Sequence, residues 1–144
     1  MLATVRLFAQ QSKFEMNGTC SISQAGDCRM ASDPFEVKIT LDIDQKTGRI
    51  AMEEFWKNEK GNFEKKQDIA WSGEVLSKSN IRVMRFTQVR QFNCGKDKRS
   101  ETLHFIGVVD FSNGYSVKLQ DRYAMCPASN CIFDIDYSLI LKAK

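Results

Sequence analysis

Residues 35–44 of the chain read FEVKITLDID, the clearest regular pattern in the sequence. Apolar side chains alternate strictly with polar ones from Phe35 to Asp44. A period of two gives a β-strand one dry face and one wet face, whereas a helix needs a period of about 3.6. The stretch therefore predicts a long strand in an antiparallel sheet that is buried on one side only.

Comparable segments lie on both sides of this strand. They are rich in alternating, β-branched or aromatic residues and cover 12–19, 49–57, 63–76, 81–92, 102–111, 115–125 and 132–142. Most links between them are short and polar, and the step from Asn113 to Gly114 is the strongest hairpin signal. About eight strands in a meander predict an all-β fold, a single antiparallel up-and-down β-barrel that forms one domain over residues 1–144. A two-sheet sandwich is the alternative, although its crossing connections usually need longer links.

The expected layout resembles that of the lipocalin-like and calycin barrels. The resemblance is to the layout and not to a motif. The lipocalin G-x-W signature near the first strand is missing, because Gly18-Thr19-Cys20 has cysteine where tryptophan would stand. We therefore assign no family from the sequence. A barrel of about eight strands either packs its interior with side chains or holds one small ligand.

The composition is that of a soluble globular protein, with 42% hydrophobic and 27% charged residues in a chain of 144. The formal net charge of +3 is spread along the chain and not concentrated in one patch. We therefore expect no nucleic-acid partner. No stretch approaches the roughly 20 apolar residues of a membrane-spanning helix, so no membrane span is expected.

The direction of successive strands predicts that the two ends of the barrel differ. One end, the mouth, receives the longer links 20–34, 58–62, 93–101 and 126–131, and the other receives the tight links 45–48, 77–80 and 112–114. All five cysteines fall in mouth links under this assignment. Because ligand sites of small barrels lie preferentially in the mouth, we expect a binding site there.

The cysteine spacing suggests local disulfides. Cys20 lies near Cys28 in sequence, and Cys126 near Cys131, close enough for each pair to reach the roughly 5.5 Å between Cα atoms that a disulfide needs. Cys94 would then be the odd cysteine, and other connectivities remain open. Disulfides of this kind favour a secreted or periplasmic location.

Inward polar side chains are the candidates for a ligand site, because a buried charge is costly unless it is paired or used. Keeping the apolar faces inward gives Glu54, Trp56, Trp71, Arg90, Asp121 and Tyr123 as ligand-binding residues, with Arg90 inside only if Met84 and Phe86 also point inward. An inward arginine can hold a ligand carboxylate through its planar fork. The alternative is a polar plug in which these charges pair with one another.

Metal and catalytic sites are not expected. The spacings C-x7-C and C-x4-C differ from those of zinc knuckles, and His104 is the single histidine. No nucleophile elbow, phosphate-binding glycine loop or dinucleotide fingerprint occurs. We therefore predict no enzyme, no metal and no cofactor.

Two functions remain from the sequence. The first is a secreted or periplasmic barrel that binds a small, partly apolar or amphipathic molecule at its mouth. The second is a protein-interaction module, such as an inhibitor of a secreted hydrolase, that presents disulfide-braced mouth loops. Apolar residues expected on the outer faces also allow a protein partner or a homo-oligomer, and these are Phe55, Leu76, Ile106, Val108 and Ile140.

Overall fold

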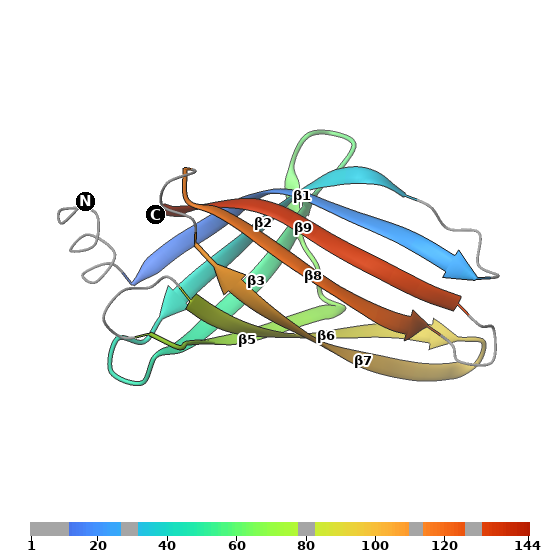
Figure 1. The fold of residues 1–144 in the computed structure, drawn as a ribbon. Helices are drawn as coiled ribbons and strands as arrows, with labels where there is room; N and C mark the ends of the chain where they lie inside the picture. Colours follow the sequence, from blue (N-terminus) through green and yellow to red (C-terminus); the bar gives the residue numbers. More distant parts are fainter. Residues whose placement is uncertain (1–11, 27–31, 78–82, 110–113, 126–130) are drawn as a thin grey trace.

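The computed structural model describes residues 12–26, 32–77, 83–109, 114–125 and 131–144 (Figure 1). Its strands are β1 (Lys13–Gly26), β2 (Ser32–Ile43), β3 (Arg49–Lys57), β4 (Phe63–Lys65), β5 (Ile69–Val75), β6 (Val83–Cys94), β7 (Asp97–Val108), β8 (Ser116–Met125) and β9 (Cys131–Ala143). Within these ranges no helix is long and apolar enough to cross a membrane. The strand predicted from residues 35–44 is the body of β2.

The strands form one antiparallel sheet that curls into a nearly closed barrel. Their hydrogen-bonded order is β7-β6-β5-β3-β2-β1-β9-β8, and β4 pairs with β3 beside this path. The first and last strands pair along their whole length, from Phe14 opposite Ala143 to Gly26 opposite Cys131. The prediction of an all-β barrel is confirmed, and the layout is consistent with a lipocalin-like barrel.

Among the described residues, β7 and β8 are not joined by a backbone ladder, and we call the line where these two strands meet the seam of the barrel. The Asn113–Gly114 signal predicts a hairpin between the segments 102–111 and 115–125, but the corresponding strands β7 and β8 are the two ends of the hydrogen-bonded order. Leu119 of β8 packs so close to Gly107 of β7 that a Cβ on Gly107 would lie 3.4 Å from its Cδ2. Side chains therefore close the seam where backbone pairing would be expected.

The strands extend farther toward the mouth than the sequence predicted. β1 continues past Thr19 to Gly26, which puts Cys20 inside a strand. The predicted charged loop 93–101 is wrong, because β6 and β7 pair up to Cys94 opposite Asp97. Gly95 has a φ of 65°, the left-handed conformation that a tight hairpin turn between two strands requires. The mouth therefore has a hydrogen-bonded hairpin where a loop was expected.

The segment 63–76 forms two strands and not the single strand predicted. β4 pairs with the mouth-side end of β3, where Phe55 lies opposite Lys65. β5 pairs with the other end of β3, where Met52 lies opposite Trp71. The N–H of Lys66 donates to the carbonyl of Glu54 and anchors the break between the two strands. The predicted links 77–80, 112–114 and 126–131 fall mostly outside the described residues.

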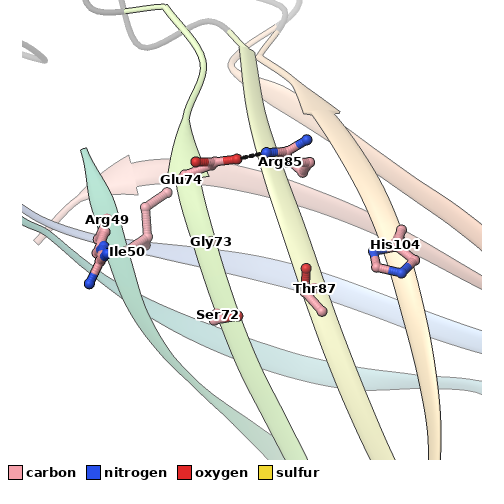
Figure 2. A pocket seen from close by; sticks show the side chains of 8 residues that line it. All are labelled: Arg49, Ile50, Ser72, Gly73, Glu74, Arg85, Thr87 and His104. Carbon is pink, nitrogen blue, oxygen red and sulfur yellow. Dashed lines mark hydrogen bonds and ion pairs between the residues drawn. The ribbon is translucent and has the colours of Figure 1, made fainter. Parts of the chain in front are cut away.

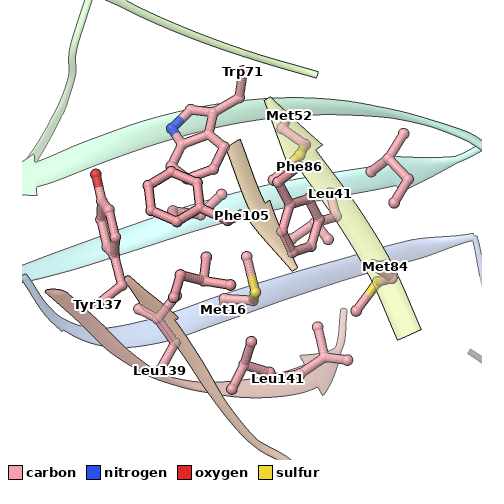
Figure 3. Packing of buried hydrophobic residues seen from close by; sticks show 14 of the residues in the cluster. Met16, Leu41, Met52, Trp71, Met84, Phe86, Phe105, Tyr137, Leu139 and Leu141 are labelled. Atoms are coloured by element: carbon pink, nitrogen blue, oxygen red, sulfur yellow. The ribbon is translucent and has the colours of Figure 1, made fainter. Parts of the chain in front are cut away.

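The interior away from the mouth is apolar and well packed (Figure 3). Met16, Met84 and Phe105 are at most 1% exposed and fill the space between the strands. The ring of Phe86 occupies the space beside two glycines, since a Cβ on Gly73 would lie 2.8 Å from it and one on Gly107 2.7 Å. Close packing of this kind stabilises the barrel and leaves polar chemistry to the mouth-side half.

Candidate functional site

The inward face of β6 carries the first part of the site. Met84, Phe86, Gln88 and Arg90 are buried, whereas Arg85 between them is exposed. The sequence left two faces possible for this strand, and the structure selects the face that puts Arg90 inside. Packing decides the choice, because the Phe86 ring fits the space left by the glycines of β5 and β7.

Glu54 of β3 is the acidic centre of the site and is 1% exposed. Its Oε1 accepts hydrogen bonds from Trp71 Nε1 at 3.0 Å and from the Tyr137 hydroxyl at 2.8 Å. Its Oε2 accepts a further hydrogen bond from Trp56 Nε1. A buried carboxylate is tolerated when donors surround it, so these contacts account for an acidic side chain inside the barrel.

Tyr137 of β9 joins this acidic centre to the arginine. Its hydroxyl donates to Glu54 and accepts from Gln88 Nε2 at 2.8 Å and from Arg90 Nη2 at 2.7 Å. Gln88 Oε1 in turn accepts from Arg90 Nε at 2.6 Å. We call Glu54, Trp71, Gln88, Arg90 and Tyr137 the buried polar network. It crosses the interior from β3 and β5 to β6 and β9, so it separates the apolar core from the mouth.

Arg90 is the part of the network with unused capacity. It is 8% exposed, and its Cζ lies 5.9 Å from the ring centroid of Tyr123. Gln88 and Tyr137 each take one of its N–H groups, and the Tyr123 hydroxyl also interacts with it. An arginine has more N–H donors than these contacts use. Donors of Arg90 therefore remain without a partner among the described residues.

Burial and the neighbouring charges shift the pKa values of Arg90 and Tyr137. Burial by itself lowers the pKa of Arg90, but Tyr137 and Glu54 outweigh this effect and raise the pKa above its usual value. Burial and the nearby Glu54 charge raise the pKa of Tyr137 well above its usual range. Arg90 therefore stays positively charged, and the Tyr137 hydroxyl keeps its proton at neutral pH.

Aromatic rings surround the network on the mouth side. Trp56 packs against Phe35 with ring centroids 4.4 Å apart, and Lys66 Nζ lies 4.2 Å from the centroid of the Trp56 ring. Tyr123 stacks on Phe133 with centroids 5.3 Å apart. Rings with polar edges give this part of the barrel a partly apolar lining.

The structure brings most of the predicted ligand-binding residues together. Glu54, Trp71 and Arg90 belong to the buried polar network, Trp56 donates to it, and Tyr123 lies beside it. Asp121 does not join them. The network also contains Gln88 and Tyr137, which were not predicted as ligand-binding residues. Cys20 lies opposite Tyr137 on β1 and was not predicted as part of this site either.

Asp121 instead spans the seam of the barrel. Its Oδ2 accepts a hydrogen bond at 2.9 Å from the backbone N–H of His104 on β7. Its Oδ1 accepts one at 2.8 Å from the N–H of Arg122 on its own strand. The seam leaves the N–H of His104 without a strand partner, and a side-chain carboxylate supplies the missing acceptor.

We expect Asp121→Ala to lower the free energy of unfolding by about 1–2 kcal/mol, since it removes a charge-assisted hydrogen bond across the seam. Urea denaturation of the purified protein measures this loss. Gln120→Ala, at an exposed neighbouring position, is the control and should change stability by less than about 0.5 kcal/mol. Equal stabilities for the two variants would show that Asp121 does not hold the seam.

The predicted pairing of Cys20 with Cys28 is wrong. Cys20 is a free, fully buried thiol in β1, and burial followed by the Glu54 charge raises its pKa to about 12. Cys94, taken as the odd cysteine from the sequence, is disulfide-bonded, and its partner is not among the described side chains. Cys28 and Cys126 lie outside the described residues. The sequence placed Cys20 in a loop because β1 was expected to end too early.

The outer surface carries the apolar residues predicted for a contact patch. Ile106, Val108 and Ile140 are each slightly more than half exposed, at 54%, 54% and 53%, and Leu76 is 47% exposed. Phe55 is half-buried, with Lys38 Nζ 4.8 Å from its ring centroid. A protein partner or a second copy of the chain stays a prediction. Among the described residues, no three histidine, cysteine, aspartate or glutamate side chains gather as a metal site requires.

Fold and site together define a small antiparallel β-barrel whose interior is crossed by a hydrogen-bonded polar network. No family model, no curated protein and no solved structure matches the chain. Its function is therefore inferred from the chemistry of the site alone.

Proposed function

We propose that this barrel binds a small, partly apolar molecule with an anionic group, on the mouth side of the buried polar network. The observation that carries the proposal is Arg90, a buried cation with unused N–H donors beside aromatic rings. A desolvated guanidinium is stabilised by a planar anion that accepts two parallel hydrogen bonds. A carboxylate is the simplest such group.

The opposite charge of Glu54 does not take up this capacity. Its carboxylate already accepts hydrogen bonds from Trp56, Trp71 and Tyr137. Glu54 reaches Arg90 only through the Tyr137 hydroxyl, which bonds to both. The polar plug expected as an alternative is thus complete on the acidic side and incomplete on the basic side, which favours an anion and not a cation as ligand.

The apolar part of the ligand would lie against the aromatic rings of the mouth. Trp56 and Tyr123 pack against the core but are only partly buried. Both side chains present an apolar face and a polar edge, which suits an amphipathic molecule. The network closes the way to the apolar core, so we place the ligand above it and not deep in the barrel.

This function is a binding function, and the proposal includes no catalytic step, metal or cofactor. The polar groups of the network are hydrogen-bonded to one another, which suits a fixed receptor more than proton transfer. A secreted or periplasmic location is part of the proposal, and the disulfide at Cys94 supports it because disulfides persist in oxidising compartments.

A titration followed by tryptophan fluorescence tests the proposal, with decanoic acid and decanol as probes. We expect decanoic acid to bind at least tenfold more tightly than decanol. The Arg90→Lys substitution keeps the charge but loses the planar fork. We therefore expect it to lower the affinity for decanoic acid by about tenfold or more. Arg122→Lys, at an exposed outer position, should bind decanoic acid as the unmodified protein does. Equal affinities for acid and alcohol, or no effect of Arg90→Lys, would contradict the proposal.

A protein-interaction module is the second candidate, and one observation favours it. The β6–β7 hairpin continues past the last residue of β6 that pairs with β5, Arg90, as far as Cys94 opposite Asp97. Residues 95–100 at its tip are all exposed. A projecting, hydrogen-bonded hairpin is well suited to enter a partner's cleft. Under this alternative, substitutions at the tip would abolish capture of a partner, and Arg90→Lys would not.

A further inference from the structure

A hollow lies on the outer face of the barrel, away from the buried polar network (Figure 2). It has a volume of about 500 Å³, within the range of small-molecule sites. Its lining comes from β3, β5, β6 and β7 and consists of Arg49, Ile50, Ser72, Gly73, Glu74, Arg85, Thr87 and His104. None of the predicted ligand-binding residues lines it.

Strand register explains why the surface is hollow here. Ala51, Ser72, Thr87 and His104 are lateral neighbours on four adjacent strands and share the outer face. The first three side chains are small. The next row toward the base contains larger side chains, because Arg49 pairs with Glu74 and Glu74 with Arg85. Small residues bordered by large ones leave a trough across the sheet.

Hydrogen-bond donors predominate around the trough. The Arg49 guanidinium, the Ser72 and Thr87 hydroxyls and the His104 imidazole have no hydrogen-bond or ion-pair partner among the described residues. The one carboxylate of the lining, Glu74, is paired with Arg85. Two further carboxylates belong to the surroundings of the trough: Asp121 accepts from the backbone N–H groups of His104 and Arg122, and Asp42 lies opposite Ala51 on β2. Within the lining itself, uncommitted donors outnumber the single, paired carboxylate, which favours an anionic ligand.

We propose that this hollow binds the phosphate group of a small phosphorylated molecule, independently of the mouth site. Arg49 and Arg85 stand on the two sides of Glu74, and the hydroxyls of Ser72 and Thr87 lie beside them, so donors approach from several directions. A tetrahedral oxyanion can use donors from several directions, whereas a planar carboxylate is satisfied by a single fork. The volume beyond the phosphate leaves room for an attached polar group such as a sugar.

The test is a titration of the full chain with glucose 1-phosphate at constant ionic strength, followed by amide NMR, with glucose as the uncharged probe. We expect saturable shifts at Ser72, Gly73, Thr87 and His104 with glucose 1-phosphate and none with glucose. Arg49→Gln should weaken binding by about tenfold, as expected for loss of a charge-assisted contact. Lys118→Gln removes the same charge from an exposed position on β8 and should leave the affinity unchanged.

Two results would overturn the inference. One is the absence of saturable shifts at these amides with glucose 1-phosphate. The other is equal weakening by Arg49→Gln and Lys118→Gln, which would show general attraction between anions and a basic protein. Arg49 is exposed, and thermal unfolding checks that its substitution leaves the barrel folded. Decanoic acid should not shift the same amides, so this experiment and the mouth titration can fail separately.

Discussion

Tyr137→Phe should lower the free energy of unfolding by about 3–5 kcal/mol, a large part of the stability of a domain this size. The substitution removes one oxygen atom that donates to Glu54 and accepts from Gln88 and Arg90. All three partners are buried and would lose a hydrogen bond without gaining water. Urea denaturation monitored by circular dichroism measures the loss.

The packing of the ring should contribute little to this loss. Phenylalanine keeps the edge contacts of the Tyr137 ring with Trp71 and Phe105, whose centroids lie 5.7 and 5.9 Å away. Tyr123→Phe is the matched control, because it removes a tyrosine hydroxyl at a half-buried position beside the network. We expect it to cost less than about 1 kcal/mol. A loss of that size for Tyr137→Phe as well would mean that the network contributes little to stability.

Gly18→Ala is the second substitution with a large expected effect, about 3 kcal/mol or more. A Cβ on Gly18 would overlap the backbone carbonyl oxygen of Ser138 on β9 and lie 2.9 Å from Leu139 Cα. These are backbone atoms of a paired strand, so only separation of β1 from β9 relieves the overlap. Because this pairing joins the first and last strands, its loss would open the barrel.

The control for Gly18→Ala is Thr19→Ala, at the next residue, which is exposed on the outer face. It should change stability by less than about 0.5–1 kcal/mol. Thermal unfolding of both variants measures the difference. If Gly18→Ala were as stable as Thr19→Ala, the close approach of β1 and β9 at Ser138 would be wrong.

Alternation in the sequence was enough to predict most of the strands and most of the facings, although it did not show the break between β4 and β5. The period of two in residues 35–44 set the inward face of β2, and the same rule placed Glu54 inside. The ends of strands were harder, because β1 continues through Thr19 and Cys20 into residues that carry no clear alternation. The seam was missed for a different reason: the Asn-Gly signal describes a local turn, whereas Leu119 and Gly107 meet through tertiary packing.

Three of the five residues of the buried polar network were predicted from the sequence, and Gln88 and Tyr137 were not. A charged residue in an apolar row, such as Glu54, is conspicuous in sequence. Tyr137 lies in a row with Ile135 and Leu139 and looks like an ordinary core residue, because its hydroxyl matters only when its partners are known. Asp121 was predicted to be a ligand residue because alternation shows which face of a strand a side chain lies on. Alternation does not show that this carboxylate accepts a hydrogen bond from the backbone of the strand across the seam.

Arg90 is held by the buried polar network, and we propose that its free donors bind an anion at the mouth. The most direct measurement is NMR of the Arg90 Nε–H with and without decanoic acid, compared with Arg99 at an exposed position. We expect slow hydrogen exchange of the Arg90 Nε–H, since it donates to Gln88, and a saturable shift when decanoic acid is added. Exchange as fast as that of Arg99, with no shift, would contradict the proposal.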